Sequence, residues 1–255
     1  MSAPESSTLA PHAATPGTRT LVVTPTYNER DNIESFVNSV FLWAPSAHVL
    51  IVDDNSPDGT GDLADALARK DPRVRVMHRP EKLGLGTAYV SAFLQALRQD
   101  YDFFFEMDAD HSHDPRHLPD FFQAFAQGAD VIVGSRNVPG GGIEGWGLDR
   151  HLLSKGGSFY SRTILGVDVR DLTTGYKAFT RRALEEIDLS LVGSNGYSFQ
   201  IEMTFRALMK GLKVVEVPIV FVDRELGRSK MNRRIFAEAV LVVWKLRWAA
   251  LRHQL

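Results

Sequence analysis

Two aspartates, Asp108 and Asp110, directly follow an aromatic and apolar run, residues 101–107, of the kind that forms a buried strand. In open α/β sheets, ligands bind at the carboxyl ends of the strands. Hard carboxylate oxygens at that edge suit Mg²⁺ or Mn²⁺, ions that usually bridge to the phosphates of a substrate. Because aspartate is also common in turns, this spacing alone favours a turn over a metal site. The interpretation as a metal site therefore depends on the segments upstream.

Three earlier segments also end a strand-like run on polar residues. They are residues 25–30, 53–60 and 79–86, which follow strand-like runs at residues 21–24, 49–52 and 74–77. Each segment alone could be a turn or a helix cap, because Asp, Asn, Ser and Gly are frequent in both. Together with Asp108 and Asp110 they would lie along one edge of a sheet. We therefore interpret the four segments as the rim of a binding site.

The elements that must position this rim alternate along the chain. Helical patterns cover residues 31–42, 62–69, 87–97 and 118–126, and a further strand-like run covers residues 131–133. Helices between successive strands are typical of crossover units, so the order predicts an α/β fold with a mostly parallel central sheet flanked by helices. Beyond it, residues 154–165 and 199–209 favour helix, and residues 214–222 favour a strand that is broken at Pro218.

The alternation is interrupted at residues 138–147, where five of the ten residues are glycine. This composition predicts a loop without helix or strand. The loop is either a solvated linker or a lid over a site, and the sequence leaves both open.

The composition of the 255 residues, 44% hydrophobic and 24% charged, is ordinary for a globular protein. Without cysteine the chain has no disulfide, thiol nucleophile or thiolate zinc site, and a reducing compartment such as the cytoplasm is compatible with it. Residues 1–18 lack an apolar core, so we expect a disordered tail rather than a signal peptide. We expect one domain over residues 19–231.

Charge is distributed unevenly along the chain. From Arg224 to the end there are eight Lys and Arg residues against two carboxylates, which is +6, and this leaves −8 for the rest of a chain with net charge −2. A basic terminus on an acidic body suits a polyanionic ligand or a membrane surface. Nucleic acid is not expected as a partner, because no nucleic-acid motif is present. No apolar run reaches the length of about 18 residues that a spanning helix needs.

Residues 232–255 mix apolar bulk with cations and predict an amphipathic C-terminal helix. Trp244 and Trp248, four residues apart, fall on one face of such a helix. The helix either lies in the headgroup region of a membrane or packs on the domain core. In the first case the protein associates peripherally with the cytoplasmic face of a membrane, with room for a separate membrane-anchoring protein as a partner.

The order of these motifs resembles the inverting glycosyltransferases of family 2. The motifs are Pro-x-Tyr-Asn-Glu at residues 25–29, Val-Asp-Asp-x-Ser-x-Asp-Gly-Thr at residues 52–60, Leu-Gly-x-Gly at residues 83–86 and Asp-Ala-Asp at residues 108–110. More closely, the chain is similar to the dolichol-phosphate (polyprenol-phosphate) mannose synthases. That similarity rests on residues 107–113, 134–136, 171–173, 199–203, 221–224 and 229–230. It extends from about Thr20 to Met231.

The resemblance implies an A-type glycosyltransferase domain that binds a nucleotide sugar. It implies transfer of mannose from GDP-mannose to a polyprenyl (dolichyl) monophosphate, with inversion and with Mg²⁺ or Mn²⁺ as cofactor. It further implies that Asp108 and Asp110 hold the metal, with the backbone of Ala109 close to the nucleotide. Ser112 stands where some members have glutamine, so no role as a metal ligand is assigned to it.

The remaining site residues are also implied by the resemblance. Those lining the guanosine end are Pro25, Tyr27, Glu29, Val52 and Asp54. Those contacting phosphates or the sugar are Arg136, Arg224 and Lys230. Those near the acceptor phosphate are Arg136, Arg150 and Ser154. We expect Asp110 and Arg136 to be catalytic, and we assign no catalytic base, because a phosphate monoester is mostly dianionic at neutral pH.

Two other functions are compatible with the motifs. One is a polyprenyl-phosphate glucosyltransferase that uses a UDP-sugar, and the other is a non-catalytic subunit of a membrane complex. His111 and His113 could tune the electrostatics of the site, but a histidine after a turn is more often structural.

Overall fold

The computed structural model describes residues 19–145, 148–222 and 233–252, and for residues 148–154 and 233–239 it describes the backbone alone. The tail predicted for residues 1–18 lies outside the described residues, as does the predicted boundary at residues 231–232.

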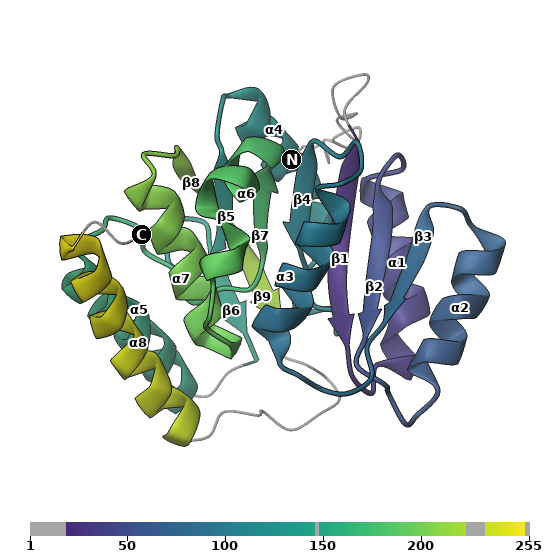
Figure 1. Ribbon diagram of the computed structural model, residues 1–255, viewed down its shortest axis with the longest axis horizontal. Helices are drawn as coiled ribbons and strands as arrows, with labels where there is room; N and C mark the ends of the chain where they lie inside the picture. The colour runs from purple at the N-terminus through teal and green to yellow at the C-terminus, as the bar shows by residue number, and fades with distance from the viewer. Residues whose placement is uncertain (1–18, 146–147, 223–232, 253–255) are drawn as a thin grey trace, which may run out of the picture.

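A seven-stranded sheet with the order β3-β2-β1-β4-β7-β5-β8 forms the centre of the molecule (Figure 1). Its strands are β1 (Thr20–Thr26), β2 (His48–Asp53), β3 (Val74–His78), β4 (Phe103–Glu106), β5 (Val131–Ser135), β7 (Lys177–Thr180) and β8 (Val214–Pro218). Every pairing is parallel except those of β7, which runs antiparallel to both β4 and β5. The predicted mostly parallel sheet is confirmed.

Side chains that alternate along the strands build two separate cores, one on each face of the sheet. On one face, Val22 of β1 packs with α1 (Arg30–Trp43), α2 (Thr60–Lys70) and α4 (Leu118–Ala126). On the other face, Leu21 and Val23 pack with helices α3 (Leu85–Ala96), α6 (Arg181–Ile187) and α7 (Gly196–Met209). This alternation follows from the two-residue period of a strand, and it explains why the strands read as continuous apolar runs.

The predicted helices lie where the sequence places them, with small changes at their ends. The range predicted for α4 is confirmed without change, and α1, α2 and α3 each differ by at most two residues at either end. Helix α5 (Leu148–Leu165) begins six residues before its predicted start, and α7 begins three residues before. Helix α6 and two short 3₁₀ helices, Pro115–His117 and Leu189–Leu191, were not predicted.

The glycine-rich segment contains a strand, so the prediction of a structureless loop at residues 138–147 is wrong. Residues Gly142–Glu144 form β6, which pairs in parallel with β9 (Val220–Val222) in a separate two-stranded sheet. A Cβ at Gly141 would overlap the carbonyl oxygen of Ser135, so glycine lets the turn fold back onto the end of β5. The break predicted at Pro218 is confirmed, because β8 ends there and β9 belongs to the second sheet.

Helices α5 and α8 (Arg233–Leu251) form a third layer outside α7, at the left of Figure 1. Val243 and Leu246 of α8 are buried against Ile201 and Phe205 of α7. Trp244 is 46% exposed and points away from that contact. The described part of α8 therefore packs on the core while keeping an apolar outer face. None of the helices in the described ranges is both long and apolar enough to span a membrane.

Candidate functional site

The rim predicted from the sequence forms at one edge of the sheet. Strand β1 lies between β2 and β4 and is parallel to both, so the segments that follow all three leave the sheet on the same side. Several hydrogen bonds tie the first two segments together, among them two from backbone N–H groups. The N–H of Asp54 donates to the carbonyl oxygen of Thr26 at 3.1 Å, and the N–H of Glu29 donates to the hydroxyl of Thr60 at 3.0 Å.

At the end of the rim predicted to bind the nucleoside, Lys82 covers the ring of Tyr27. The ammonium nitrogen lies 4.0 Å from the centre of the half-buried aromatic ring, as in a cation–π contact. Pro25 is half-buried at the end of β1, and Val52 is buried. Glu29 accepts a hydrogen bond from the side chain of Asn32 at 2.9 Å. The structure brings these predicted donor-site residues together.

Asp54 is buried in an ion pair with Arg79, a residue for which no role was predicted from the sequence. The guanidinium donates to both carboxylate oxygens, from Nε at 2.6 Å and from Nη2 at 2.9 Å. Arg79 also donates to the hydroxyl of Thr87 and to the carbonyl oxygen of Gly84 at the start of α3. This pair fixes the orientation of Asp54 and anchors the segment that carries Lys82.

The Asp108–Asp110 turn is held from inside by His113. The backbone N–H of Asp108 donates to Nδ1 of His113 at 2.9 Å, so the neutral ring carries its proton on Nε2. His113 is buried and stacks on Tyr176. At the end of the turn, Oδ1 of Asp110 accepts from the N–H of Ser112 at 3.1 Å and from its hydroxyl at 2.5 Å. His113 and Ser112 therefore shape the turn.

The donor set of this turn fits a small divalent cation that binds together with a phosphorylated ligand. Asp108 and Asp110 offer hard carboxylate oxygens, and both side chains are partly exposed. In the described part of the chain, no group of three or more His, Cys, Asp or Glu side chains is arranged to hold a metal ion. Two carboxylates leave several coordination positions for phosphate oxygens and water, which is the manner in which Mg²⁺ is usually bound.

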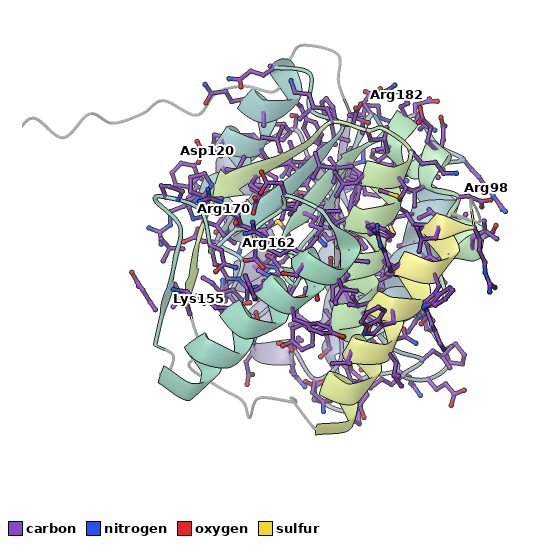
Figure 2. The ribbon with its side chains drawn as sticks, turned by 90° about the vertical axis from the view of Figure 1, so that its left-hand side faces the viewer. Arg98, Asp120, Lys155, Arg162, Arg170 and Arg182 are labelled. Atoms are coloured by element: carbon purple, nitrogen blue, oxygen red, sulfur yellow. The ribbon has the colours of Figure 1, made fainter. Side chains whose placement is uncertain are left out.

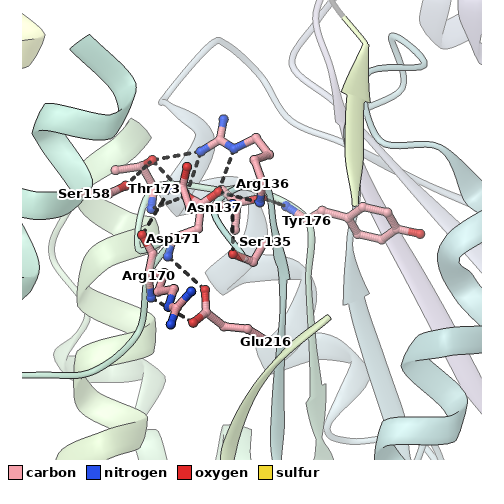
Figure 3. A network of polar contacts seen from close by, with 10 residues as sticks. Ser135, Arg136, Asn137, Ser158, Arg170, Asp171, Thr173, Tyr176 and Glu216 are labelled. Carbon is pink, nitrogen blue, oxygen red and sulfur yellow. Dashed lines mark hydrogen bonds and ion pairs between the residues drawn. The ribbon is translucent and has the colours of Figure 1, made fainter. Parts of the chain in front are cut away.

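Arg136, at the end of β5, forms a buried ion pair with Asp171 (Figure 3). Its Nε donates to Oδ2 of Asp171 at 2.7 Å, and its Nη2 donates to Oδ1 at 2.8 Å and to the hydroxyl of Thr173 at 2.9 Å. Asp171 is 0% exposed and also accepts from the backbone N–H of Arg136. Burial opposes ionisation of this carboxyl, but the charge of Arg136 and these hydrogen bonds outweigh it, and the pKa of Asp171 lies below its ordinary value.

A second buried pair lies next to the Asp108–Asp110 turn, at the end of β4. Glu106 of β4 is opposite Lys177 of β7, and both side chains are fully buried. Burial raises the pKa of Glu106 to about 7 and lowers the pKa of Lys177 to about 7, because each charged form loses its hydration. The Lys177 ammonium donates to the carbonyl oxygen of Gln200. No role was predicted for this pair from the sequence.

A cavity of about 580 Å³ lies beside Arg136, between α5 and the turn that follows β5. The lining residues that the structure describes are Arg136, Asn137, Val138, Pro139, Gly141, Lys155, Phe159, Arg162 and Arg170. Four of these nine side chains are cationic and none is a carboxylate. The cavity therefore has the chemistry of an anion site.

The side chains of four predicted site residues lie outside what the structure describes. Arg224 and Lys230 lie outside the described residues. Arg150 and Ser154 lie on α5, but the structure describes only their backbone. Their assignments stay predictions.

The functional candidates that the sequence did not identify are Arg79, Lys82, Asp171 and the cations of α5 and the segment after it. Arg79, Lys82 and Asp171 lie inside motifs that were recognised, but their partners are far away in the chain. Arg79 pairs with a residue 25 positions away, and Arg136 pairs with one 35 positions away. A search for basic residues seven positions apart would have found Lys155 and Arg162 on one face of α5.

Comparison with known proteins identifies the family of the chain. The family model described as glycosyl transferase family 2 matches residues 21–188. Among curated proteins, the chain is 51% identical over 240 residues to the polyprenol monophosphomannose synthase of Mycolicibacterium smegmatis, covering 93% of this chain and 91% of that protein. It is 47% identical over 241 residues to the undecaprenyl-phosphate mannosyltransferase of Micrococcus luteus, covering 93% of this chain and 99% of that protein.

Solved structures share the fold at lower identity. Glucosyl-3-phosphoglycerate synthase from Mycobacterium tuberculosis, in complex with phosphoglyceric acid, superposes with a TM-score of 0.65 at 19% identity, over 90% of this chain and 80% of that one. The complex of the same enzyme with Mn²⁺, uridine diphosphate and glucosyl-3-phosphoglycerate gives a TM-score of 0.64 at 19% identity, over 91% of this chain and 80% of that one. The predicted A-type glycosyltransferase fold is confirmed.

Proposed function

The chain belongs to glycosyl transferase family 2, and from that premise we propose that it transfers a mannosyl group from a nucleotide sugar to a polyprenyl monophosphate. The observation that carries this proposal is the near full-length identity, 51% and 47%, to two mannosyltransferases whose names specify a polyprenyl acceptor. The hydrogen bonds that orient Asp110 and Arg136 also support the proposal.

We further propose that the donor is GDP-mannose. Support comes from the resemblance of the motifs to the dolichol-phosphate mannose synthases and from the rim at β1 and β2. The ring of Tyr27, stacked under Lys82, offers a face for a purine base, and the Asp54 carboxylate offers acceptor oxygens whose position Arg79 fixes. A guanine base presents N–H donors to such an acceptor.

A divalent cation, Mg²⁺ or Mn²⁺, is proposed as cofactor, held by Asp108 and Asp110. When bound, it would neutralise charge on the diphosphate that leaves the sugar. The chain's own part is to hold the turn that carries the two carboxylates: His113 accepts a hydrogen bond from the backbone N–H of Asp108, and the N–H of Ser112 donates to the Asp110 carboxylate. Two carboxylates that are already oriented need no reorganisation when the donor binds.

In the proposed reaction, the bond between the anomeric carbon and the diphosphate oxygen breaks, and a bond from that carbon to an acceptor phosphate oxygen forms on the opposite face. The products are a polyprenyl β-mannosyl phosphate and GDP. Because the acceptor phosphate is already mostly dianionic, no side chain has to remove a proton. The main demand on the protein is to bring two anions together, so cations near both phosphates are essential.

Peripheral membrane binding through α8 forms part of the proposal. The outer face of α8 carries four large apolar side chains, Leu241, Trp244, Trp248 and Leu251, of which Trp248 is 57% exposed. Arg252 lies over the ring of Trp248 at 5.6 Å. Aromatic rings flanked by cations are typical of a helix in the headgroup region of a bilayer.

The decisive test of function is an assay with purified protein, a panel of nucleotide sugars and a short-chain polyprenyl phosphate, with Mg²⁺ or Mn²⁺. We expect mannosyl phosphate product with GDP-mannose and loss of turnover when EDTA removes the metal. Product formed only from UDP-glucose would contradict the donor assignment. A chain inert towards every donor would point to a non-catalytic subunit.

Replacing both Trp244 and Trp248 with serine is expected to reduce partitioning onto anionic vesicles by about tenfold or more, because two aromatic contacts with the headgroup region are lost. Deleting α8 would be a poorer test, because the loss of Val243 and Leu246 would expose the core residues that they cover. The measurement is vesicle sedimentation. Leu42→Ser, a change at an exposed residue of α1, is the matched control and should leave sedimentation unchanged. Unchanged sedimentation of the double variant would exclude this face as the membrane contact.

A further inference from the structure

The ion pair of Arg136 with Asp171 raises a question about the acceptor site. A paired guanidinium and carboxylate have no net charge together, so this pair offers hydrogen bonds to an incoming phosphate but little attraction. The reaction has to bring an acceptor dianion close to an anionic donor. Cations other than Arg136 must therefore supply the attraction.

The cavity beside Arg136 contains such cations. Lys155, Arg162 and Arg170 line it together with Arg136. Figure 2 labels the first three of these side chains. Arg162 has one weak partner, with its Nη2 lying 3.4 Å from Oδ1 of Asp168, a carboxylate that is 95% exposed. Glu216 accepts from the backbone N–H groups of Arg170 and Asp171, which fixes the segment that carries Arg170. In the described part of the cavity, carboxylates therefore compensate the charge of these three side chains only weakly, and the cations can attract an anionic ligand.

The walls of the cavity are rigid elements. Lys155, Phe159 and Arg162 are spaced i, i+4 and i+7, so they share one face of α5, while Ser158 and Ser161 of that helix are buried. Ser158 lies 3.4 Å from the hydroxyl of Thr173, a partner of Arg136. The opposite wall is the turn at residues 138–141, held against β5. Side chains on a helix and a tight turn are suited to a preformed site.

The cavity is also connected to the metal-binding turn. The guanidinium of Arg136 lies over the ring of Phe221 at 5.6 Å, and that ring contacts His113 with 6.0 Å between centroids. His113 in turn accepts the hydrogen bond from Asp108. An anion in the cavity therefore lies next to the side chains that connect it to the donor phosphate site.

The distribution of polarity suits an amphiphile with an anionic head. The cations line the cavity together with Phe159, which is 69% exposed on the same helical face. Helix α5 packs beside α8, the helix with the exposed tryptophans (Figures 1 and 2). A phosphate inside the cavity would leave an attached isoprenoid chain free to pass over Phe159. A free anion without an apolar tail would gain nothing from contact with that ring.

We infer that this cavity receives the phosphate of the acceptor lipid, that Lys155, Arg162 and Arg170 capture it electrostatically, and that Phe159 contacts the first part of the isoprenoid chain. The inference rests on the proposed function and adds residues beyond Arg136, Arg150 and Ser154. It makes these three cations binding residues for the acceptor, with no part in donor binding.

The test is a variant in which Lys155, Arg162 and Arg170 are all replaced by glutamine. For a short-chain polyprenyl phosphate without membranes, we expect KM to rise about 3-fold for each single change and about 30-fold for the triple change, because partly exposed cations contribute modestly. KM for GDP-mannose and kcat should change less than about 2-fold. The wild-type acceptor KM should rise with ionic strength, and that dependence should be weaker in the variant.

The matched control replaces Arg69 and Lys70 of α2 with glutamine, at the opposite edge of the molecule (Figure 1). It removes exposed cations far from the cavity and should leave acceptor KM unchanged. Thermal unfolding of every variant checks that the fold is intact. Phe159→Ser should raise KM for the polyprenyl phosphate while leaving inhibition by inorganic phosphate unchanged.

Three results would overturn the inference. An acceptor KM that is unaltered in the triple variant, together with weaker binding to phosphatidylglycerol vesicles, would assign the cations to phospholipid headgroups. An equal rise in KM for the donor would assign them to the nucleotide diphosphate. If acceptor KM, donor KM and vesicle binding were all unchanged, the three cations would be solvated surface residues without a ligand. Calorimetric binding of the polyprenyl phosphate, lost in the triple variant, would support the cavity even if the wild type transferred no sugar, so failure of the proposed function is distinguishable.

Discussion

An Asp110→Asn variant is expected to lose about 10³-fold or more in kcat, because the developing charge on the leaving diphosphate would no longer be stabilised by a properly held cation. The substitution is chosen for its geometry. The asparagine carbonyl oxygen can still accept the hydrogen bonds that Oδ1 of Asp110 receives from Ser112, so the turn should keep its shape. The measurement is kcat for GDP-mannose at saturating Mg²⁺ or Mn²⁺, together with the melting temperature.

Two further variants control this result. Ser112→Ala removes one hydrogen bond to Asp110 but keeps the carboxylate, and we expect a decrease of less than about 10-fold in kcat. Asp120→Asn changes an exposed carboxylate on α4 and should have no effect. If the Asp110→Asn enzyme kept wild-type turnover and the same metal dependence, Asp110 would not be a metal ligand.

An Arg136→Met variant is expected to lower the free energy of unfolding by about 3–5 kcal/mol, because it leaves Asp171 buried without its cation. Asp171 is wholly inaccessible, and three of the hydrogen bonds it accepts come from Arg136. Of these three hydrogen bonds, only the one from the backbone N–H would remain in the variant. The measurement is urea unfolding at pH 7.

The pH dependence separates this mechanism from a general loss of packing. In the wild type the pKa of Asp171 lies below its ordinary value, so its contribution to stability is present above pH 3.8 and is lost as pH falls through the folded pKa. Without Arg136, burial should raise that pKa above the ordinary value. The destabilisation of Arg136→Met should therefore be greatest at neutral pH and decrease as the solution is acidified.

The Arg136→Met/Asp171→Leu double variant should recover much of the lost stability, because no buried charge is left unpaired. Lys155→Gln removes a neighbouring but exposed cation and should change stability by less than about 0.5 kcal/mol. A single Arg136→Met variant as stable as the wild type would show that Asp171 does not depend on the ion pair. A loss of activity in an Arg136 variant is therefore not sufficient evidence for phosphate binding, because the same change removes the partner of the buried Asp171.

The fold could be predicted from the sequence to the extent that it depends on local patterns. Apolar runs and helical periodicity located six of the seven central strands and the described helices other than α6, and α4 was located to the residue. β7 was missed because its four residues include the fully buried Lys177, which breaks the apolar pattern of a central strand. β6 was wrongly excluded because glycine composition predicts backbone freedom, whereas pairing with β9 depends on residues almost 80 positions later.

The same distinction applies to the candidate site. The segments at the ends of β1, β2 and β4 were predicted because the order of strands alone brings them to one edge. The partners that orient the site residues were not. Asp54 with Arg79, and Arg136 with Asp171, are pairs whose members lie in separate motifs, and nothing local in the sequence connects them. Electrostatic pairing of distant residues is a property of the folded chain.

The small sheet of β6 and β9 has one more consequence. Both strands run in the same direction and end side by side, at Glu144 and Val222. Residues 148–165 continue from the first strand into one wall of the basic cavity, and Arg224 follows the second strand by two positions. The backbone hydrogen bonds between β6 and β9 thus link the chain that leads to the proposed acceptor cavity with the chain that leads to Arg224, a proposed phosphate-binding residue. We expect that loading either ligand alters the rate at which backbone amides in both strands exchange with deuterium, even when the other ligand is absent.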